Sequence, residues 1–118
     1  MDPASTSFQG LRAIGQEESL QAGRVLWREG DRGEEVVLLL DGVLEVVHEP
    51  PGAEPVVLRR LEPGAIAGEF ACLDGHERSA AVRAVTPCRV LRVPAAGFRE
   101  LVSRRHDIVL ELFWQQVD

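Results

Sequence analysis

GEFACLDGHERSAAV, residues 68–82, is the most informative stretch of this 118-residue chain. It begins with a glycine beside a carboxylate, continues through a short apolar turn, and ends with an arginine followed by small residues. The Glu69 carboxylate can accept hydrogen bonds from hydroxyl groups, and the Arg78 guanidinium offers a planar fork of donors to phosphate oxygens. Residues 68–72 can form one helical turn whose unpaired N–H groups face an anion. The stretch therefore favours a site for a compact anion that carries a sugar.

The order and spacing of these residues resemble the phosphate-binding cassette of the cyclic-nucleotide-binding domain family. Glu69 precedes Arg78 by nine positions, and the residues Ser-Ala-Ala-Val follow the arginine. The nearest likeness is to bacterial regulators of the catabolite activator type. Taken singly, the glycine–glutamate pair would indicate only a turn, and Arg78 only a solvated strand end paired with Glu77. Their combination carries the resemblance.

The resemblance extends over roughly residues 8–117. Residues 22–31 are similar to the family's turn, strand and glycine–acid bend, and residues 36–42 to its third strand and tight turn. Residues 61–64, Leu-Glu-Pro-Gly, resemble the approach to the cassette, and residues 82–91 the last two strands. Several weak motifs thus occur in the family's order around one more specific motif.

One departure from the family's pattern lies directly before the cassette. The family usually has a glycine–aspartate pair ahead of its Gly-Glu, whereas this chain reads GAIAGE over residues 64–69. The missing acid and the small Ala67 are expected to change the local packing. They leave the residues expected to contact a ligand in place.

The resemblance implies a ligand-binding sensory module rather than an enzyme, with cyclic AMP as the first candidate ligand and cyclic GMP as the second. Arg78 would neutralise the cyclic phosphate, and Glu69 would accept a hydrogen bond from the ribose 2′-hydroxyl. Val46 and Leu58, on strands before the cassette, would pack against the base. The full set of expected ligand-binding residues is Gly68, Glu69, Phe70, Ala71, Arg78, Ser79, Ala80, Val46 and Leu58. No catalytic residue and no further cofactor are implied.

Composition narrows the class of protein. The chain is 45% apolar and 27% charged, which is usual for a globular protein, and residues 1–118 are expected to form a single domain. The net charge of −6 argues against nucleic acid as a direct partner, because neutralising phosphates needs a basic face. No long apolar run or export signal predicts a membrane partner. Two cysteines, Cys72 and Cys88, are typical of a reduced cytoplasmic protein rather than a disulfide scaffold.

Turn signals recur about every ten residues from Gly23 onward, with short valine- and leucine-rich runs between them. This spacing predicts a mainly β fold, an antiparallel jelly-roll β-sandwich. Asp41-Gly42 between two apolar runs is the strongest hairpin signal. Trp27 is expected in the core. The expected strands include residues 36–40, 43–47, 56–58, 80–85 and 90–93.

A short helix is expected before the sandwich. Residues 1–7 are small and polar and are expected to form a disordered tail. A serine or threonine at its end can cap a helix that carries Phe8, Leu11 and Ile14 at helical spacing. The sequence thus predicts one short N-terminal helix that ends before Gly15.

Two short helices are expected after the sandwich. Residues 95–102 follow Pro94 and form the first, and residues 107–118 form the second, with Asp107 as its cap. One sandwich face can bury only part of the second helix's apolar surface. That surface comprises Ile108, Val109, Leu110, Leu112, Phe113, Trp114 and Val117. The surplus predicts a homodimer through this helix, and no residues after it supply a DNA-reading helix-turn-helix.

Two other functions remain open from the sequence alone. A degenerate module can keep the fold, lose its ligand and serve for dimerisation or docking. A jelly roll with His48, His76 and Glu69 can instead suggest a small metalloenzyme, and Cys72 lies four positions before His76. However, the paired histidines that such an enzyme needs on one strand are missing, and closed metal sites usually have tighter, repeated ligand pairs. The sequence therefore favours no metal ligand.

Overall fold

The computed structural model describes residues 5–68 and 75–117, with residues 112–117 through their backbone alone. The chain folds into two antiparallel sheets with helices before and after them in the sequence. The elements are α1 (Thr6–Ile14), β1 (Gln16–Leu20), β2 (Val25–Trp27), β3 (Glu35–Asp41), β4 (Leu44–His48), β5 (Val56–Leu61), β6 (Ile66–Ala67), β7 (Ala81–Ala84), β8 (Cys88–Pro94), α3 (Ala95–Arg104) and α4 (His106–Val117).

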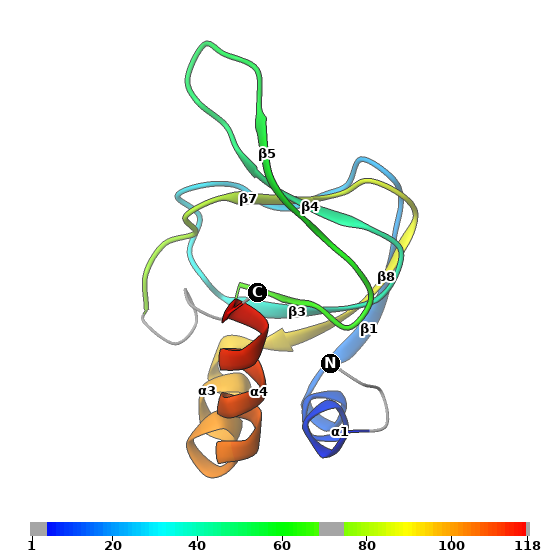
Figure 1. Ribbon diagram of the computed structural model, residues 1–118, viewed down its shortest axis with the longest axis vertical. Helices are drawn as coiled ribbons and strands as arrows, with labels where there is room; N and C mark the ends of the chain where they lie inside the picture. Colours follow the sequence, from blue (N-terminus) through cyan, green and yellow to red (C-terminus); the bar gives the residue numbers. More distant parts are fainter. Residues whose placement is uncertain (1–4, 69–74, 118) are drawn as a thin grey trace.

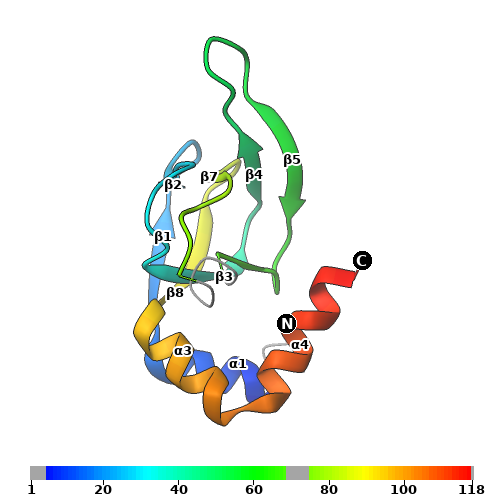
Figure 2. The same cartoon turned by 90° about the vertical axis from the view of Figure 1, so that its left-hand side faces the viewer.

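The two sheets pack face to face, with strand orders β1-β8-β3-β6 and β2-β7-β4-β5. The helices gather at one end of the molecule, beneath the first sheet, and the loop between β4 and β5 projects from the other end (Figure 1). Figure 2 shows that α1 and α3 lie below the strands, while α4 rises from there beside the sandwich, on the side of β5. The predicted jelly-roll sandwich with flanking helices is confirmed.

Strands β3 and β8 form the centre of the fold because both of their faces are buried. On β3, Val36 and Leu38 point toward the helices, whereas Val37 and Leu39 point into the space between the sheets. Side chains alternate across a strand, so a continuous apolar run is required where each face meets a separate core. The run VVLLL over residues 36–40 supplies this pattern.

The hairpin predicted at Asp41-Gly42 joins β3 to β4. Gly42 has φ +93°, and a side chain there would lie 2.5 Å from the carbonyl oxygen of Pro87 and 2.7 Å from Cys88 Sγ. Glycine alone meets both requirements, because it tolerates positive φ and carries no Cβ. The hairpin prediction is confirmed.

Strand β1 carries almost no strand signal in its sequence, QEESL, and only Leu20 is buried. It forms because β8 supplies partners across the whole strand, from Gln16 opposite Arg92 to Leu20 opposite Cys88. Glu18 also pairs with Arg92 at 2.6 Å. The strand is therefore specified by its neighbour and not by its own pattern.

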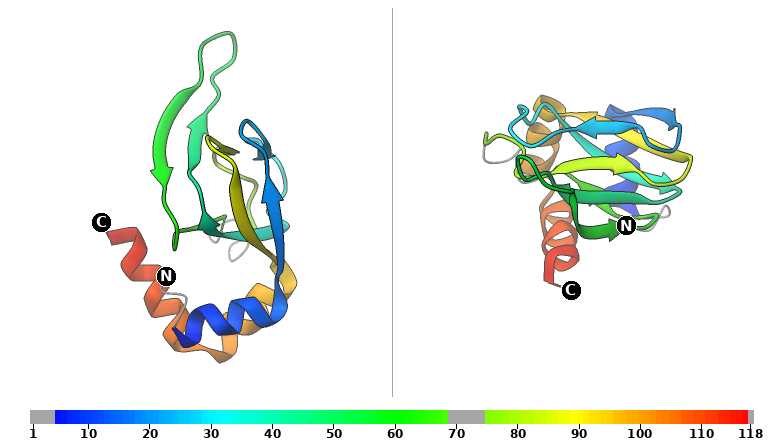
Figure 3. Two further views of the ribbon diagram at one scale, coloured as in Figure 1. Left: turned by 90° about the vertical axis from the view of Figure 1, so that its right-hand side faces the viewer. Right: turned by 90° about the horizontal axis from the view of Figure 1, so that it is seen from above.

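The ends of the chain require two corrections. Ser5 caps α1 by accepting a hydrogen bond from the N–H of Phe8 at 3.0 Å, and Ser7 is buried, so the prediction of a disordered tail is wrong for residues 5–7. The last helix begins at His106, one residue before the predicted start, and Asp107 therefore lies in its first turn and not at its cap. The two views of Figure 3 follow this helix to its end.

The Asp107 carboxylate joins the two ends of the chain. It accepts hydrogen bonds from Thr6 at 3.3 Å, Ser7 at 3.4 Å and the Arg105 guanidinium at 2.7 Å. The hydrogen bond from Arg105 is the main cause that lowers the pKa of Asp107 to about 2. None of the helices in the described ranges is long and apolar enough to cross a membrane.

Candidate functional site

Gly68 and Arg78, near the two ends of the predicted cassette, meet in the structure. Gly68 follows β6, and Arg78 lies shortly before β7. The Arg78 guanidinium donates a hydrogen bond from Nη1 to the carbonyl oxygen of Gly68 at 3.1 Å. The main chain of Arg78 is hydrogen-bonded as well. Its N–H donates to the backbone carbonyl oxygen of Asp31 at 2.7 Å, and its own carbonyl oxygen accepts from the backbone N–H of Gly30 at 2.9 Å. Gly68 and Arg78, ten positions apart in the sequence, are thus held together.

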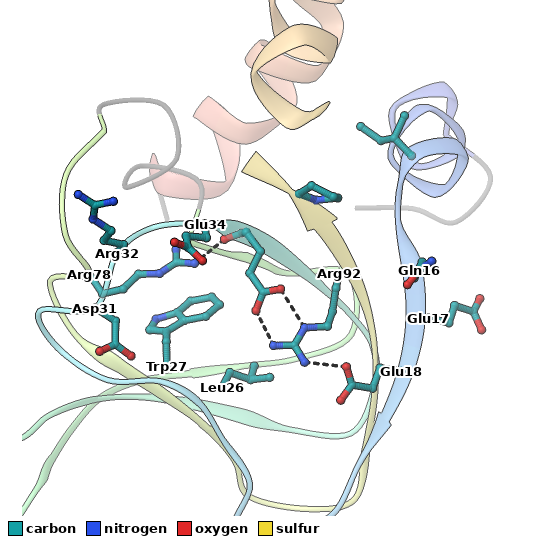
Figure 4. A pocket seen from close by; sticks show the side chains of 13 residues that line it. Gln16, Glu17, Glu18, Leu26, Trp27, Asp31, Arg32, Glu34, Arg78 and Arg92 are labelled. Carbon is teal, nitrogen blue, oxygen red and sulfur yellow. Dashed lines mark hydrogen bonds and ion pairs between the residues drawn. The ribbon is translucent and has the colours of Figure 1, made fainter. Parts of the chain in front are cut away.

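The Arg78 side chain is buried, with 5% of its surface exposed. Its Nη2 donates to the carbonyl oxygen of Glu35 at 2.5 Å, and its guanidinium carbon lies 3.6 Å from the ring centre of Trp27 (Figure 4). A buried cation is stable only where hydrogen bonds or an aromatic face replace its water. The two carbonyls and the indole provide this environment.

Gly68 fits this arrangement because it has no side chain. Its φ is +89°, a conformation that other residues rarely adopt. A methyl group there would overlap Arg78 Nη1 and would lie 2.9 Å from Trp27 Cη2 and 3.1 Å from the Glu35 carbonyl oxygen. Glycine is therefore required both by the backbone and by the close approach of Arg78.

Arg78 and Trp27 also line an open cavity of about 860 Å³ on the side of β1 and β8. Arg92 crosses this cavity and binds Glu35 at 3.0 and 2.5 Å and Glu18 at 2.6 Å (Figure 4). These hydrogen bonds, led by those to Glu35, raise the pKa of Arg92, and the Arg92 hydrogen bond is the main cause that lowers the pKa of Glu18. Acidic side chains outnumber arginines on the cavity wall, so the cavity itself is a poor site for an anion.

Residues 17–105 match the family described as the cyclic nucleotide-binding domain. The chain belongs to this family. The match covers the β-sandwich, the cassette and α3, and it includes Gly68 and Arg78. The resemblance inferred from the cassette and its flanking motifs is thereby confirmed.

Curated relatives of this cyclic-nucleotide-binding domain are longer proteins. The cAMP-activated global transcriptional regulator CRP of Salmonella typhimurium is 31% identical over 88 residues, which are 74% of this chain and 42% of that protein. The patatin-like phospholipase domain-containing protein 7 of Rattus norvegicus is 29% identical over 90 residues, which are 75% of this chain and 7% of that protein. The chain thus spans less than half of the relatives it matches, and domains of this family occur with different partner domains.

Solved structures agree with the assignment. The Thermus thermophilus catabolite activator protein matches with a TM-score of 0.80 and 24% identity, over 97% of this chain and 53% of that one. The cAMP-bound form of the EAL enzyme Bd1971 matches with a TM-score of 0.71 and 27% identity, over 86% of this chain and 27% of that one. The first similarity establishes the fold alone, and the second is to a chain whose structure was solved with cAMP.

The structure describes six of the nine predicted ligand-binding residues, since Glu69, Phe70 and Ala71 lie outside the described residues. Gly68 and Arg78 are brought into contact. Ser79 and Ala80 follow Arg78 directly, Ser79 exposed and Ala80 half-buried. The predicted helical turn over residues 68–72 also falls largely outside the described part.

The two residues predicted to contact a base lie on neighbouring strands. Val46 on β4 is opposite Val82 of β7 and packs at the edge of the core between the sheets. Leu58 on the edge strand β5 has 58% of its surface exposed. The contact of either residue with a base stays a prediction.

The alternative interpretation of Arg78, a solvated strand end paired with Glu77, does not fit the structure, because the side chain is buried. Sequence reasoning also missed its two principal neighbours. Trp27 was predicted as a core residue, which is confirmed by its 7% exposure, but its stacking on Arg78 was not foreseen. The Glu35 acceptor is a backbone carbonyl, so no side-chain pattern could have indicated it.

The residues weighed for metal binding do not come together in the described part of the chain. Within residues 5–68 and 75–117, no three histidine, cysteine or acidic residues form a metal cluster. His48 lies 2.5 Å from Glu29 through its Nδ1 atom, and Cys88 is buried with its Sγ donating to the Val43 carbonyl at 3.3 Å. Cys72 and Glu69 lie outside the described residues.

Proposed function

We propose that this chain is a sensory module that binds a cyclic purine mononucleotide, with cyclic AMP preferred to cyclic GMP, and that it is not itself an enzyme. The observation that carries the proposal is the buried Arg78 guanidinium, which is held beside Gly68. The family supports it, as do a relative named as cAMP-activated and a similar chain solved with cAMP.

The phosphate would approach Arg78 from the cassette, because acidic side chains outnumber arginines in the cavity that Arg78 and Trp27 line. The planar guanidinium suits two phosphate oxygens, and a site of low polarity strengthens their attraction. Backbone N–H groups of Ala71, Ser79 and Ala80 would complete the anion site, with Phe70 in the same turn. Glu69 would accept from the ribose 2′-hydroxyl.

The base would lie against Val46 and Leu58. Leu58 is a large apolar residue on the edge strand β5, and 58% of its surface is exposed. Covering such a side chain contributes roughly 25 cal/mol per Å² of apolar area. A bound purine would provide that cover.

We also propose that the chain is a cytoplasmic regulator that forms a homodimer through α4. Ile108 is fully buried against the other helices, whereas Val109 and Leu110 are exposed by 46% and 59%. The side of α4 that carries Ile108 therefore packs on its own chain, whereas the side that carries Val109 and Leu110 is exposed to solvent. A second α4 offers the same apolar surface and can cover it symmetrically.

Calorimetric titration with cyclic AMP, cyclic GMP and 5′-AMP tests the ligand. We expect cyclic AMP to bind most tightly, and we expect Arg78→Leu to lower its affinity by roughly 30-fold to several thousand-fold, since removing a buried partner of a charge costs about 2–5 kcal/mol. Arg89→Leu, which removes an exposed arginine of β8 that pairs with Glu17, is the matched control and should bind normally.

Two results would contradict the proposal. Unchanged cyclic AMP binding by the Arg78→Leu variant would remove Arg78 from the site. Absence of binding by the unmodified chain to any of the three nucleotides would instead favour a module that keeps the fold and serves only for docking.

A further inference from the structure

We infer that Trp27 is a positioning residue for Arg78: its indole ring fixes the plane of the guanidinium before a cyclic phosphate binds. This inference rests on the proposed function, because it assigns a role at the same site. It concerns a residue that the cassette pattern does not contain.

The guanidinium is held on its face and on its edge. The Trp27 ring lies 3.6 Å from the Arg78 guanidinium carbon, while Nη1 and Nη2 donate to the carbonyls of Gly68 and Glu35. A guanidinium is planar, with all its N–H donors in one plane. One stacked ring and two fixed acceptors therefore define both the tilt of that plane and its rotation.

The stacking pair is shielded from water. Trp27 is exposed by 7% and Arg78 by 5%. A cation over an aromatic face is held most strongly where both partners are desolvated, and tryptophan is the best of the aromatic rings for this contact. The indole is thus suited to hold a charged side chain in one orientation before the ligand arrives.

Trp27 owes its position to an irregularity in β2. Val25 is opposite Arg83 of β7, but Trp27 is opposite Val82, so two steps along β2 correspond to one step along β7. Regular antiparallel pairing would place Trp27 opposite Ala81. Such bulges turn a side chain away from the direction that the regular pleat would give it. Here the indole lies against Gly68 and beneath the Arg78 guanidinium, as Figure 4 shows for Trp27 and Arg78.

The fixed backbone around Arg78 supports the same role. The Gly30–Arg78 and Arg78–Asp31 hydrogen bonds join the residue to the turn that follows β2. Trp27 and Arg78 are consequently joined both by their stacking and through the backbone of the turn that follows β2. A ligand that binds Arg78 would meet a guanidinium already oriented by these contacts, which reduces the entropy lost on binding.

The competing interpretation is that Trp27 only fills the core. Both Trp27 and Leu44 are buried in the core between the sheets, but only Trp27 stacks on Arg78. The test therefore compares cyclic AMP affinity in Trp27→Phe, Trp27→Leu and Leu44→Ala variants of the whole chain, with the melting temperature of each. Phenylalanine keeps an aromatic face, leucine keeps an apolar side chain without one, and Leu44→Ala loosens the same core at a residue that does not stack on Arg78.

We expect Trp27→Leu to weaken cyclic AMP binding by roughly 10- to 30-fold and Trp27→Phe by about threefold or less. We expect Leu44→Ala to lower the melting temperature without changing the affinity. Equal affinities in Trp27→Leu and the unmodified chain would overturn the inference. A loss in Leu44→Ala as large as that in Trp27→Leu would do the same, since core loosening alone would then explain both.

Tryptophan fluorescence provides a second test that does not depend on the Trp27→Leu variant folding. The chain has two tryptophans, so Trp114→Phe leaves Trp27 as the single emitter. Its emission should shift in the ligand-free Arg78→Leu, Trp114→Phe double variant, because the charge above the ring is removed. It should also shift on addition of cyclic AMP, with the same midpoint as the calorimetric titration.

The outcomes separate this inference from the proposed function. If the unmodified chain binds no cyclic nucleotide but Arg78→Leu shifts the emission, the proposed function fails and the stacking pair stands without a ligand role. If cyclic AMP binds but neither cyclic AMP nor Arg78→Leu changes the Trp27 emission, the positioning role fails and the proposed function stands.

Discussion

Substitution of Gly68 by alanine is expected to damage both stability and ligand binding, because Gly68 meets two separate requirements. Its φ of +89° lies in the left-handed region, and a methyl group would overlap the Arg78 guanidinium. The neighbouring groups cannot easily move away, since the Trp27 ring atom and the Glu35 carbonyl oxygen would lie only 2.9 and 3.1 Å from the methyl carbon. Arg78 is therefore the group expected to be displaced.

The expected loss in the free energy of unfolding of Gly68→Ala has two causes, the backbone conformation and the displacement of Arg78. A residue other than glycine in the left-handed conformation costs about 1–2 kcal/mol. Displacing Arg78 breaks a hydrogen bond from a charged group to a carbonyl, which contributes about 1.5–3 kcal/mol. We therefore expect Gly68→Ala to lower the free energy of unfolding by about 2.5–5 kcal/mol and the affinity for cyclic AMP by at least about tenfold.

Gly23→Ala is the matched control for the backbone cause. Gly23 has φ +88°, nearly the same as Gly68, and no atom lies within 4 Å of the position its Cβ would occupy. Urea unfolding of this variant should show the loss of about 1–2 kcal/mol alone, and calorimetry should show unchanged affinity. If Gly68→Ala loses no more stability than Gly23→Ala and binds cyclic AMP normally, Arg78 is not held against Gly68 as the structure describes.

Three further predictions address the sugar, the last helix and the chain ends. Glu69→Gln should weaken binding of cyclic AMP much more than binding of its 2′-deoxy analogue, which already lacks the hydroxyl; equal losses in calorimetry would contradict a sugar contact. Leu110→Glu, at an exposed position of α4, should convert a dimer to a monomer in light scattering without lowering the melting temperature, whereas a monomeric unmodified chain would end the dimer proposal. Asp107 has a folded pKa of about 2 against an ordinary 3.8, so its contribution to stability is present above about pH 4 and is lost as the pH falls toward 2. The melting temperatures of the unmodified chain and Asp107→Asn should accordingly differ at pH 7 and converge near pH 2. A difference that does not change with pH would show that ionisation of the Asp107 carboxylate does not contribute to stability.

The sequence predicts those parts of the fold whose causes are local. The Asp41-Gly42 turn and the apolar run of β3 were identified because turn chemistry and side-chain alternation act over a few residues. The capped N-terminal helix was identified for the same reason, although its start at Thr6 was placed inside a tail. Strand β1 could not be found in this way, because its pairing with β8 depends on residues far along the chain.

In the candidate site, too, the sequence predicts the residues of a local motif but not the contacts that depend on distant parts of the chain. Gly68 and Arg78 were identified from the spacing of the cassette, and the structure brings them to 3.1 Å. The contact between Arg78 and Trp27 depends on a bulge in β2 and on its pairing with β7, which no local pattern records. The departure at Ala67 was expected to alter packing; Ala67 in fact pairs with Val37 in the short strand β6 and is buried.

A crystal structure of the chain grown with cyclic AMP would show whether Arg78 binds the cyclic phosphate. We expect a phosphate oxygen within about 3 Å of the Arg78 guanidinium, with the Trp27 ring still covering one face of that group. A nucleotide bound elsewhere, or a guanidinium that makes no contact with the phosphate, would contradict the assignment of this site.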